Sequence, residues 1–170
     1  MSHERPTEPS RGDVPAPMNA GRARALAERL HHGQRHRDGT ALIEHVRRVA
    51  SAVPGDACVV AWLHEALEHT AISEEALLAD GVSLDQLRAI RLLTRDLDLR
   101  SDETYLAHVE RVARARGPGA EIARTVKHAD LADRAHHAAG RSDGWSPPYA
   151  AGLDLLAAGA ARLNRAERLP

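Results

Sequence analysis

Apolar residues recur at every third or fourth position along most of the chain, and this period predicts helices from about Met18 onward. The first covers residues 22–31, where Leu26 and Leu30 lie one turn apart. Turn residues separate further predicted helices over residues 42–53, 57–69, 73–78, 84–93, 101–113, 120–138 and from 146 onward. No segment alternates apolar and polar residues over the length of a strand. The predicted fold class is therefore all-α, a single-domain bundle of about seven helices.

Serines precede four of these helices and are predicted to cap them, among them Ser101 before the helix over 101–113. Ser73 is a plausible N-cap, and Ser83 with Gln86 three residues later has the spacing of a capping box. Ser146 is followed by Pro147, which suits the first turn of the last helix.

The two ends of the sequence differ in character. Residues 1–17 contain four prolines and many polar residues without periodicity, and this composition predicts a disordered leader. Residues 18–170 are expected to form one helical domain, since this length is enough to bury a core.

Composition and charge exclude several function classes. The formal net charge is −1, which argues against a nucleic-acid polymer as partner, and no apolar run is long enough to span a membrane. The amino terminus lacks the apolar centre of a secretory signal, so the expected location is the cytoplasm. The single cysteine, Cys58, cannot form an internal disulfide and is expected to be a small core residue. Nothing in the sequence indicates an oligomeric state.

The densest candidate chemistry lies in residues 62–70, which read WLHEALEHT. On a helix, His64 and Glu68 lie one turn apart, as do Glu65 and His69. The preceding residues 58–63 are apolar and predicted to be buried. Carboxylates and imidazoles that emerge from a buried helix need partners, and one metal ion can satisfy several of them. Two metalloprotease motifs are excluded, because the zincin pattern needs His where Glu68 stands and the inverted pattern needs His where Glu65 stands.

Three other segments could converge on this helix. His45 lies beside apolar residues and is either a ligand or a hydrogen-bonded core residue. Asp130 tends towards the buried side of its helix, either as a ligand or as the ion-pair partner of Arg134 at i+4. Residues 31–39 are rich in cations and form either a solvated turn or a contact for an anion.

Together these segments match the order of motifs in a known family. Residues 31–34 read HHGQ, His45 follows eleven residues after Gln34, residues 64–70 read HEALEHT, and residues 126–130 read VKHAD. In this order the chain resembles the HD-domain metal-dependent phosphohydrolases. Within them it is most similar to the hydrolase domain of the RelA/SpoT alarmone enzymes and their small stand-alone relatives. The resemblance covers about residues 20–138.

The resemblance implies an HD-type helical bundle with a divalent metal. The implied metal ligands are His45, His64, Glu65 and Asp130. Glu68 and His69 would orient or activate the attacking water, and Arg35, His36 and Arg37 would hold the anionic substrate. Mixed imidazole and carboxylate ligands suit Mn²⁺ best, with Fe or Zn²⁺ as alternatives.

The chain departs from the family pattern at three positions. Glu65 stands where the family has the signature aspartate, His69 replaces an acidic residue, and His36 replaces an arginine of the loop. Two hypotheses follow. The first is a phosphohydrolase acting on a small nucleotide-type phosphate or diphosphate ester, for which an alarmone-like substrate is one candidate. The second is a catalytically degenerate HD-fold protein that serves as a metal- or nucleotide-binding regulatory module. A plain helical bundle with structural histidines is the third and weakest hypothesis.

Overall fold

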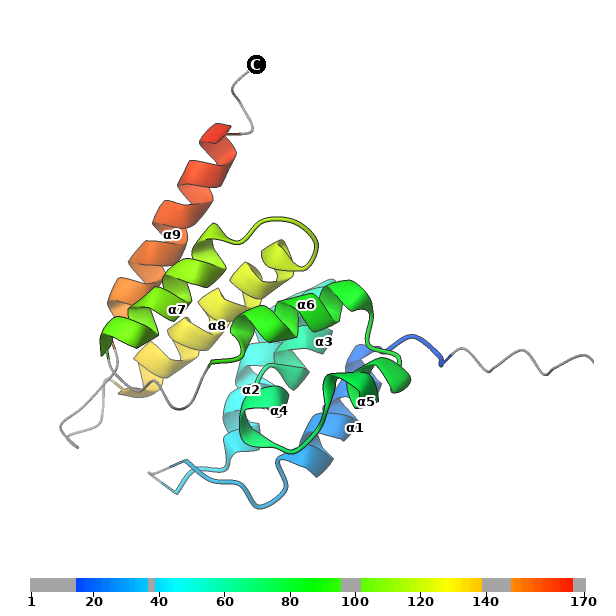
Figure 1. The fold of residues 1–170 in the computed structure, drawn as a ribbon. Helices are drawn as coiled ribbons and strands as arrows, with labels where there is room; N and C mark the ends of the chain where they lie inside the picture. The colour runs from blue at the N-terminus through cyan, green and yellow to red at the C-terminus, as the bar shows by residue number, and fades with distance from the viewer. Residues whose placement is uncertain (1–14, 37–38, 96–101, 139–147, 167–170) are drawn as a thin grey trace, which may run out of the picture.

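The computed structural model describes residues 15–36, 39–95, 102–138 and 148–166. The predicted all-α class is confirmed, since the described ranges contain nine helices and only one isolated strand-type bridge, between Arg35 and Ala41 (Figure 1). The helices are α1 (Ala20–Leu30), α2 (Leu42–Ser51), α3 (Gly55–Leu63), α4 (Ala66–His69), α5 (Glu74–Ala79), α6 (Leu84–Leu93), α7 (Asp102–Arg114), α8 (Ala120–Ala138) and α9 (Tyr149–Ala166). The number exceeds seven partly because the helix predicted over 57–69 is divided into α3 and α4.

Two of the predicted helix caps are confirmed. The Ser73 side chain accepts a hydrogen bond from the backbone N–H of Ala76, and Ser83 with Gln86 forms a complete capping box. The predicted caps at Ser101 and Ser146 lie outside the described residues, as do residues 1–14 of the predicted leader. Residues 15–17 are exposed, and Met18 is buried.

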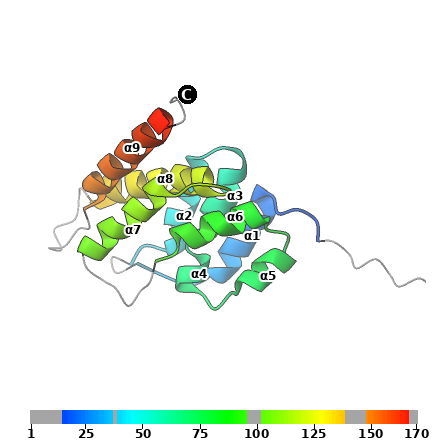
Figure 2. The ribbon, with the colours of Figure 1, turned by 45° about the horizontal axis from the view of Figure 1, so that its top comes forward.

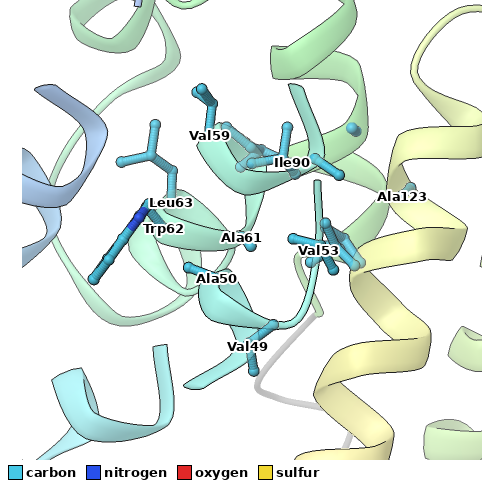
Figure 3. Packing of buried hydrophobic residues seen from close by; sticks show 14 of the residues in the cluster. Val49, Ala50, Val53, Val59, Ala61, Trp62, Leu63, Ile90 and Ala123 are labelled. Carbon is cyan, nitrogen blue, oxygen red and sulfur yellow. The ribbon is translucent and has the colours of Figure 1, made fainter. Parts of the chain in front are cut away.

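Helix α3 lies at the centre of the core. It packs against α1, α2, α6 and α8, and its residues from Val59 to Leu63 are all buried. Figure 3 shows this packing, in which Val59 and Ala61 of α3 share one cluster with Val49 of α2, Ile90 of α6 and Ala123 of α8. Because α3 is apolar on all sides and packed in the core, it fixes the position of the residues that follow Leu63.

Helices α7, α8 and α9 run side by side and form one end of the molecule (Figures 1 and 2). Gly159 allows α9 to approach α7 closely, since a Cβ at Gly159 would lie 2.8 Å from the Cβ of Ala113. Among the described residues, no helix combines the length and apolar character that a membrane crossing requires.

Helix α7 carries a buried histidine that should make stability depend on pH. His108 is 8% exposed, and its Nδ1 accepts a hydrogen bond from Arg111 at 2.8 Å. Burial, together with the nearby charges of Lys127 and Arg111, lowers the pKa of His108 to about 3. The unfolded chain therefore binds a proton at His108 more readily than the folded protein does. The free energy of unfolding is unaffected by this difference above pH 6.5, and it decreases as the pH falls from 6.5 towards 3.

We expect His108→Gln to remove this dependence, because an amide can accept the Arg111 hydrogen bond without titrating. Between pH 7 and pH 5 the wild type should lose about 2 kcal/mol more unfolding free energy than the variant. Urea denaturation at both pH values measures the difference. Equal losses in the two proteins would contradict the assignment.

Candidate metal centre

Three parts of the fold bring four metal-capable side chains together. His45 comes from α2, His64 and Glu65 from the break between α3 and α4, and Asp130 from α8. One ligand atom of each lies within 4.8 Å of one ligand atom of every other, and all four residues are buried. These are the four residues that the family resemblance implied as metal ligands.

The break at His64 and Glu65 explains how two adjacent residues can face one point. Successive side chains on a regular helix diverge by about 100°. Here α3 ends at Leu63, and Glu65 adopts φ −94° and ψ −6°, in the sparsely populated bridge region. The chain then resumes as α4, in which the His69 N–H donates to the carbonyl of Glu65. The sequence predicted a continuous helix here, because no glycine or proline marks the break.

The two histidines of the cluster, His45 and His64, are oriented through their Nδ1 atoms. His45 Nδ1 lies 2.7 Å from a carboxylate oxygen of Asp133, and His64 Nδ1 lies 2.7 Å from the carbonyl oxygen of Ala61. Both acceptors require a proton on Nδ1, which leaves the Nε2 lone pair free. Both Nε2 atoms are buried and make no hydrogen bond with the described residues. They face the carboxylates, with His45 Nε2 3.2 Å from Asp130 Oδ1 and His64 Nε2 3.4 Å from Glu65 Oε1.

The two carboxylates of the cluster are held ionised by the neighbouring cations Lys127 and Arg134. Burial opposes ionisation, but the charges of Arg134 and Lys127 hold the pKa of Asp130 well below its usual range. The charge of Arg134 has the same effect on the pKa of Glu65, again against burial. Lys127 Nζ lies 2.8 Å from Asp130 Oδ2, and Arg134 Nε lies 2.5 Å from Asp130 Oδ1. The predicted i+4 ion pair of Asp130 is thus present together with the four-residue cluster.

Arg134 also reaches across to the other ligand carboxylate. Its Nη2 donates to Glu65 Oε1, so one guanidinium bridges α8 and the break after α3. No local pattern predicts this contact, because Glu65 and Arg134 are 69 residues apart.

Glu68 and His69 lie beside the cluster in different environments. The Glu68 side chain is 4% exposed and accepts from the Arg95 backbone N–H at 3.1 Å and from Arg95 Nη2 at 2.8 Å. His69 Nε2 lies 2.9 Å from Glu65 Oε2, and its side chain is 35% exposed. The hydrogen bond with Glu65 raises the pKa of His69. The predicted stacking of Glu65 and His69 is present, whereas Glu68 pairs with Arg95 rather than with His64.

The described part of the cation-rich loop lies next to the cluster through Gln34 and His36. The His36 ring lies 5.9 Å from the His45 ring, centre to centre. Arg35 is exposed and donates to the Gly39 carbonyl of its own loop at 2.6 Å, and Arg37 lies outside the described residues. Gln34 donates to the carbonyl of His69 at 2.9 Å, which ties the loop to α4. A cavity of about 290 Å³ opens between this loop, α1 and α2.

Two supporting residues were missed by the sequence analysis. Asp133 bonds both to His45 and to Arg48, and it lies three residues after Asp130, so helical spacing was a usable signal. Arg95 holds Glu68 from 27 residues away, beyond α5 and α6, and nothing local in the sequence indicates that contact.

Asp133 provides a test of the histidine geometry. We expect Asp133→Asn to weaken Mn²⁺ binding about ten- to a hundredfold, because the amide cannot hold His45 in the same tautomer as firmly. Asp154→Asn on the exposed side of α9 is the matched control and should leave affinity unchanged. Calorimetric titration measures both, and an unaltered affinity in Asp133→Asn would exclude the supporting role.

The comparisons with known proteins agree with the fold. The structure is similar to that of a metazoan ortholog of SpoT that hydrolyzes ppGpp and plays a role in starvation responses. The TM-score is 0.65 at 20% sequence identity, over 97% of this chain and 100% of the other. This likeness shows that the chain has the HD-type helical fold implied by the sequence resemblance. No protein-family model and no curated protein matches the sequence.

Proposed function

We propose that the protein is a metal-dependent phosphohydrolase that acts on a small nucleotide-type phosphate or diphosphate ester. The observation that carries the proposal is the pair of buried Nε2 atoms, on His45 and His64, aimed at the carboxylates of Glu65 and Asp130. Buried polar atoms without partners are costly, and a cation at their focus would satisfy both. The fold shared with a ppGpp-hydrolysing protein supports the substrate class.

The donor set fits a divalent transition metal. His45, His64, Glu65 and Asp130 would hold it, and two imidazoles with two carboxylates favour Mn²⁺, with Fe or Zn²⁺ as alternatives. When bound, such an ion lowers the pKa of a coordinated water and stabilises negative charge on phosphoryl oxygens.

Glu68 and His69 are the proposed catalytic residues. Glu68 is fixed by Arg95 and offers a carboxylate that can orient or deprotonate the attacking water. His69 contacts Glu65 and is open to solvent, so it can pass a proton between the cluster and bulk water. Glu68 and His69 would thus orient and deprotonate the attacking water, the role of the two acidic residues that the family pattern has at these positions.

The loop residues Arg35, His36 and Arg37 are the proposed contacts for the anionic substrate. Arg35→Ala combined with Arg37→Ala should raise the substrate KM about tenfold while leaving kcat within about twofold, because cations that hold the charge of the substrate equally in the ground and transition states contribute to binding alone. Steady-state kinetics separate the two parameters. A KM unchanged in the double variant would remove these residues from the substrate site.

Metal content and hydrolysis test the function directly. Elemental mass spectrometry of untagged protein purified without chelator should find about one transition metal per chain, lost in His64→Ala. His128→Ala on the exposed side of α8 is the control for loss of a histidine and should keep the metal. Phosphate or diphosphate release from ppGpp and from ordinary nucleotides then identifies the substrate. A wild type that binds neither Mn²⁺ nor Zn²⁺ would exclude the hydrolase.

The degenerate binding module is the second candidate, and one observation favours it. Glu65 is paired with Arg134 and with His69, so its carboxylate already has partners within the protein, and two of the three altered positions contact each other. Changing Glu65→Asp together with His69→Asp discriminates the two. Activity that rises indicates a weakened copy of the family's site, whereas activity that falls indicates a working site built on Glu65 and His69.

A further inference from the structure

Arg134 contacts the same oxygen atoms that face the two ligand histidines. It donates to Glu65 Oε1 and Asp130 Oδ1. Glu65 Oε1 is the atom that lies 3.4 Å from His64 Nε2 and 3.6 Å from His45 Nε2, and Asp130 Oδ1 lies 3.2 Å from His45 Nε2. These two oxygens are therefore the carboxylate atoms nearest the histidine Nε2 atoms, and they would be available to a metal ion held there.

The other cations around the cluster contact atoms other than Glu65 Oε1 and Asp130 Oδ1. Lys127 contacts the second oxygen of Asp130, Oδ2. Arg48 is paired with Asp133, and Arg95 is paired with Glu68. Within the described ranges, Arg134 is therefore the one lysine or arginine whose side chain contacts both ligand oxygens.

The charges of the cluster already balance when Arg134 is counted. The four carboxylates of Glu65, Glu68, Asp130 and Asp133 face the four cations Lys127, Arg134, Arg95 and Arg48. A divalent ion added to this set would create an excess of positive charge beside a guanidinium that shares its ligands. Two cations on the same pair of oxygens repel each other strongly where little water screens them.

Arg134 has a path away from the cluster. Its side chain is 24% exposed, whereas that of Lys127 is 5% exposed. Arg134 is therefore the more accessible of the two cations, and its displacement would leave Lys127 in place on Asp130 Oδ2.

We propose that Arg134 is an internal cation that competes with the metal for Glu65 Oε1 and Asp130 Oδ1. It neutralises both carboxylates in the metal-free protein, and metal binding displaces it. The inference rests on the proposed metal site and deepens it, because it makes metal loading an exchange whose threshold is set by Arg134. The protein would accordingly respond to the concentration of free metal ion.

Calorimetric titration of Mn²⁺ into the full chain tests the proposal. Arg134→Gln should bind Mn²⁺ at least about tenfold more tightly than the wild type. Arg124→Gln is the matched control, since Arg124 is half-buried on the same helix and donates only to the backbone carbonyl of Ala115. Its affinity should equal that of the wild type.

Thermal denaturation adds a readout that does not depend on activity. Without metal, Arg134→Gln should melt below the wild type, because Glu65 loses its cation and Asp130 keeps only Lys127. With saturating Mn²⁺ its melting temperature should rise more than that of the wild type. Arg134→Lys keeps the charge but not the bridge, so it should fold normally and show a smaller change in the same direction.

The outcomes separate this inference from the proposed function. If the wild type binds Mn²⁺ and both Arg134 variants bind it equally or more weakly, competition is excluded and the metal site stands. If only the Arg134 variants bind, competition is supported and the wild type is not a metalloenzyme under those conditions. If no variant binds although all are folded by circular dichroism, both proposals fail.

Discussion

Asp130→Asn should abolish Mn²⁺ binding and lower the rate of phosphate-ester hydrolysis about a thousandfold, the loss expected when several kcal/mol of charge stabilisation disappear. Asp130 belongs to the four-residue cluster that could hold a metal ion and is 2% exposed. An amide at this position keeps the shape but offers a neutral oxygen, which is a poor ligand for a transition metal. Calorimetry and a phosphate-release assay measure the two effects.

The same substitution should also destabilise the metal-free protein by about 3 kcal/mol, because it leaves the buried ammonium of Lys127 without its carboxylate. Val126→Ala is the control for a general loss of stability. Val126 is fully buried on α8, and its apolar side chain cannot pair with a charge of the cluster. It should cost about 2 kcal/mol yet retain metal and activity below its melting temperature. If Asp130→Asn kept its metal, Asp130 would be excluded as a ligand.

Gly119→Ala should cost about 4 kcal/mol of unfolding free energy, from left-handed backbone strain and from overlap with a neighbouring helix. Gly119 has φ +79° and directly precedes α8. A Cβ there would overlap the carbonyl oxygen of Asp85 and lie 2.9 Å from the backbone nitrogen of Ala89, both on α6. Backbone atoms cannot rotate away as a side chain can, so α8 would have to shift.

Comparison with Gly117→Ala separates the effect of backbone strain from that of the close approach between Gly119 and α6. Gly117 has φ +83°, but nothing lies within 4 Å of a Cβ built there. It should therefore cost only the conformational part, about 1 kcal/mol. Chemical denaturation of both variants gives the difference, and equal losses would show that α6 and α8 tolerate a methyl group between them. Because Asp130 lies on α8, Gly119→Ala should also weaken metal binding.

The helical pattern predicted the fold well because most helices here bury one face or, in α3, all faces. Ser73 and Ser83 marked two helix starts through side-chain chemistry that acts within three residues. The break at His64 and Glu65 was missed, since it depends on the packing of α3 and not on a local breaking residue.

The candidate ligands could be predicted because their spacing and order carried the signal. His45, His64, Glu65 and Asp130 were placed by motif, and the structure brings them to one point. Ion pairs that cross the fold could not be predicted in this way. The contacts of Arg134 with Glu65 and of Arg95 with Glu68 arise only when distant helices pack.

Arg134 lies one helical turn from Asp130 on the same helix, and this tether has a consequence for any metal response. A competitor in the same chain acts at a fixed effective concentration, which dilution of the protein does not change. The metal concentration at half-loading should therefore be the same in dilute and concentrated samples. Such a threshold would be encoded in the sequence, and substitution at a single position, 134, could move it up or down.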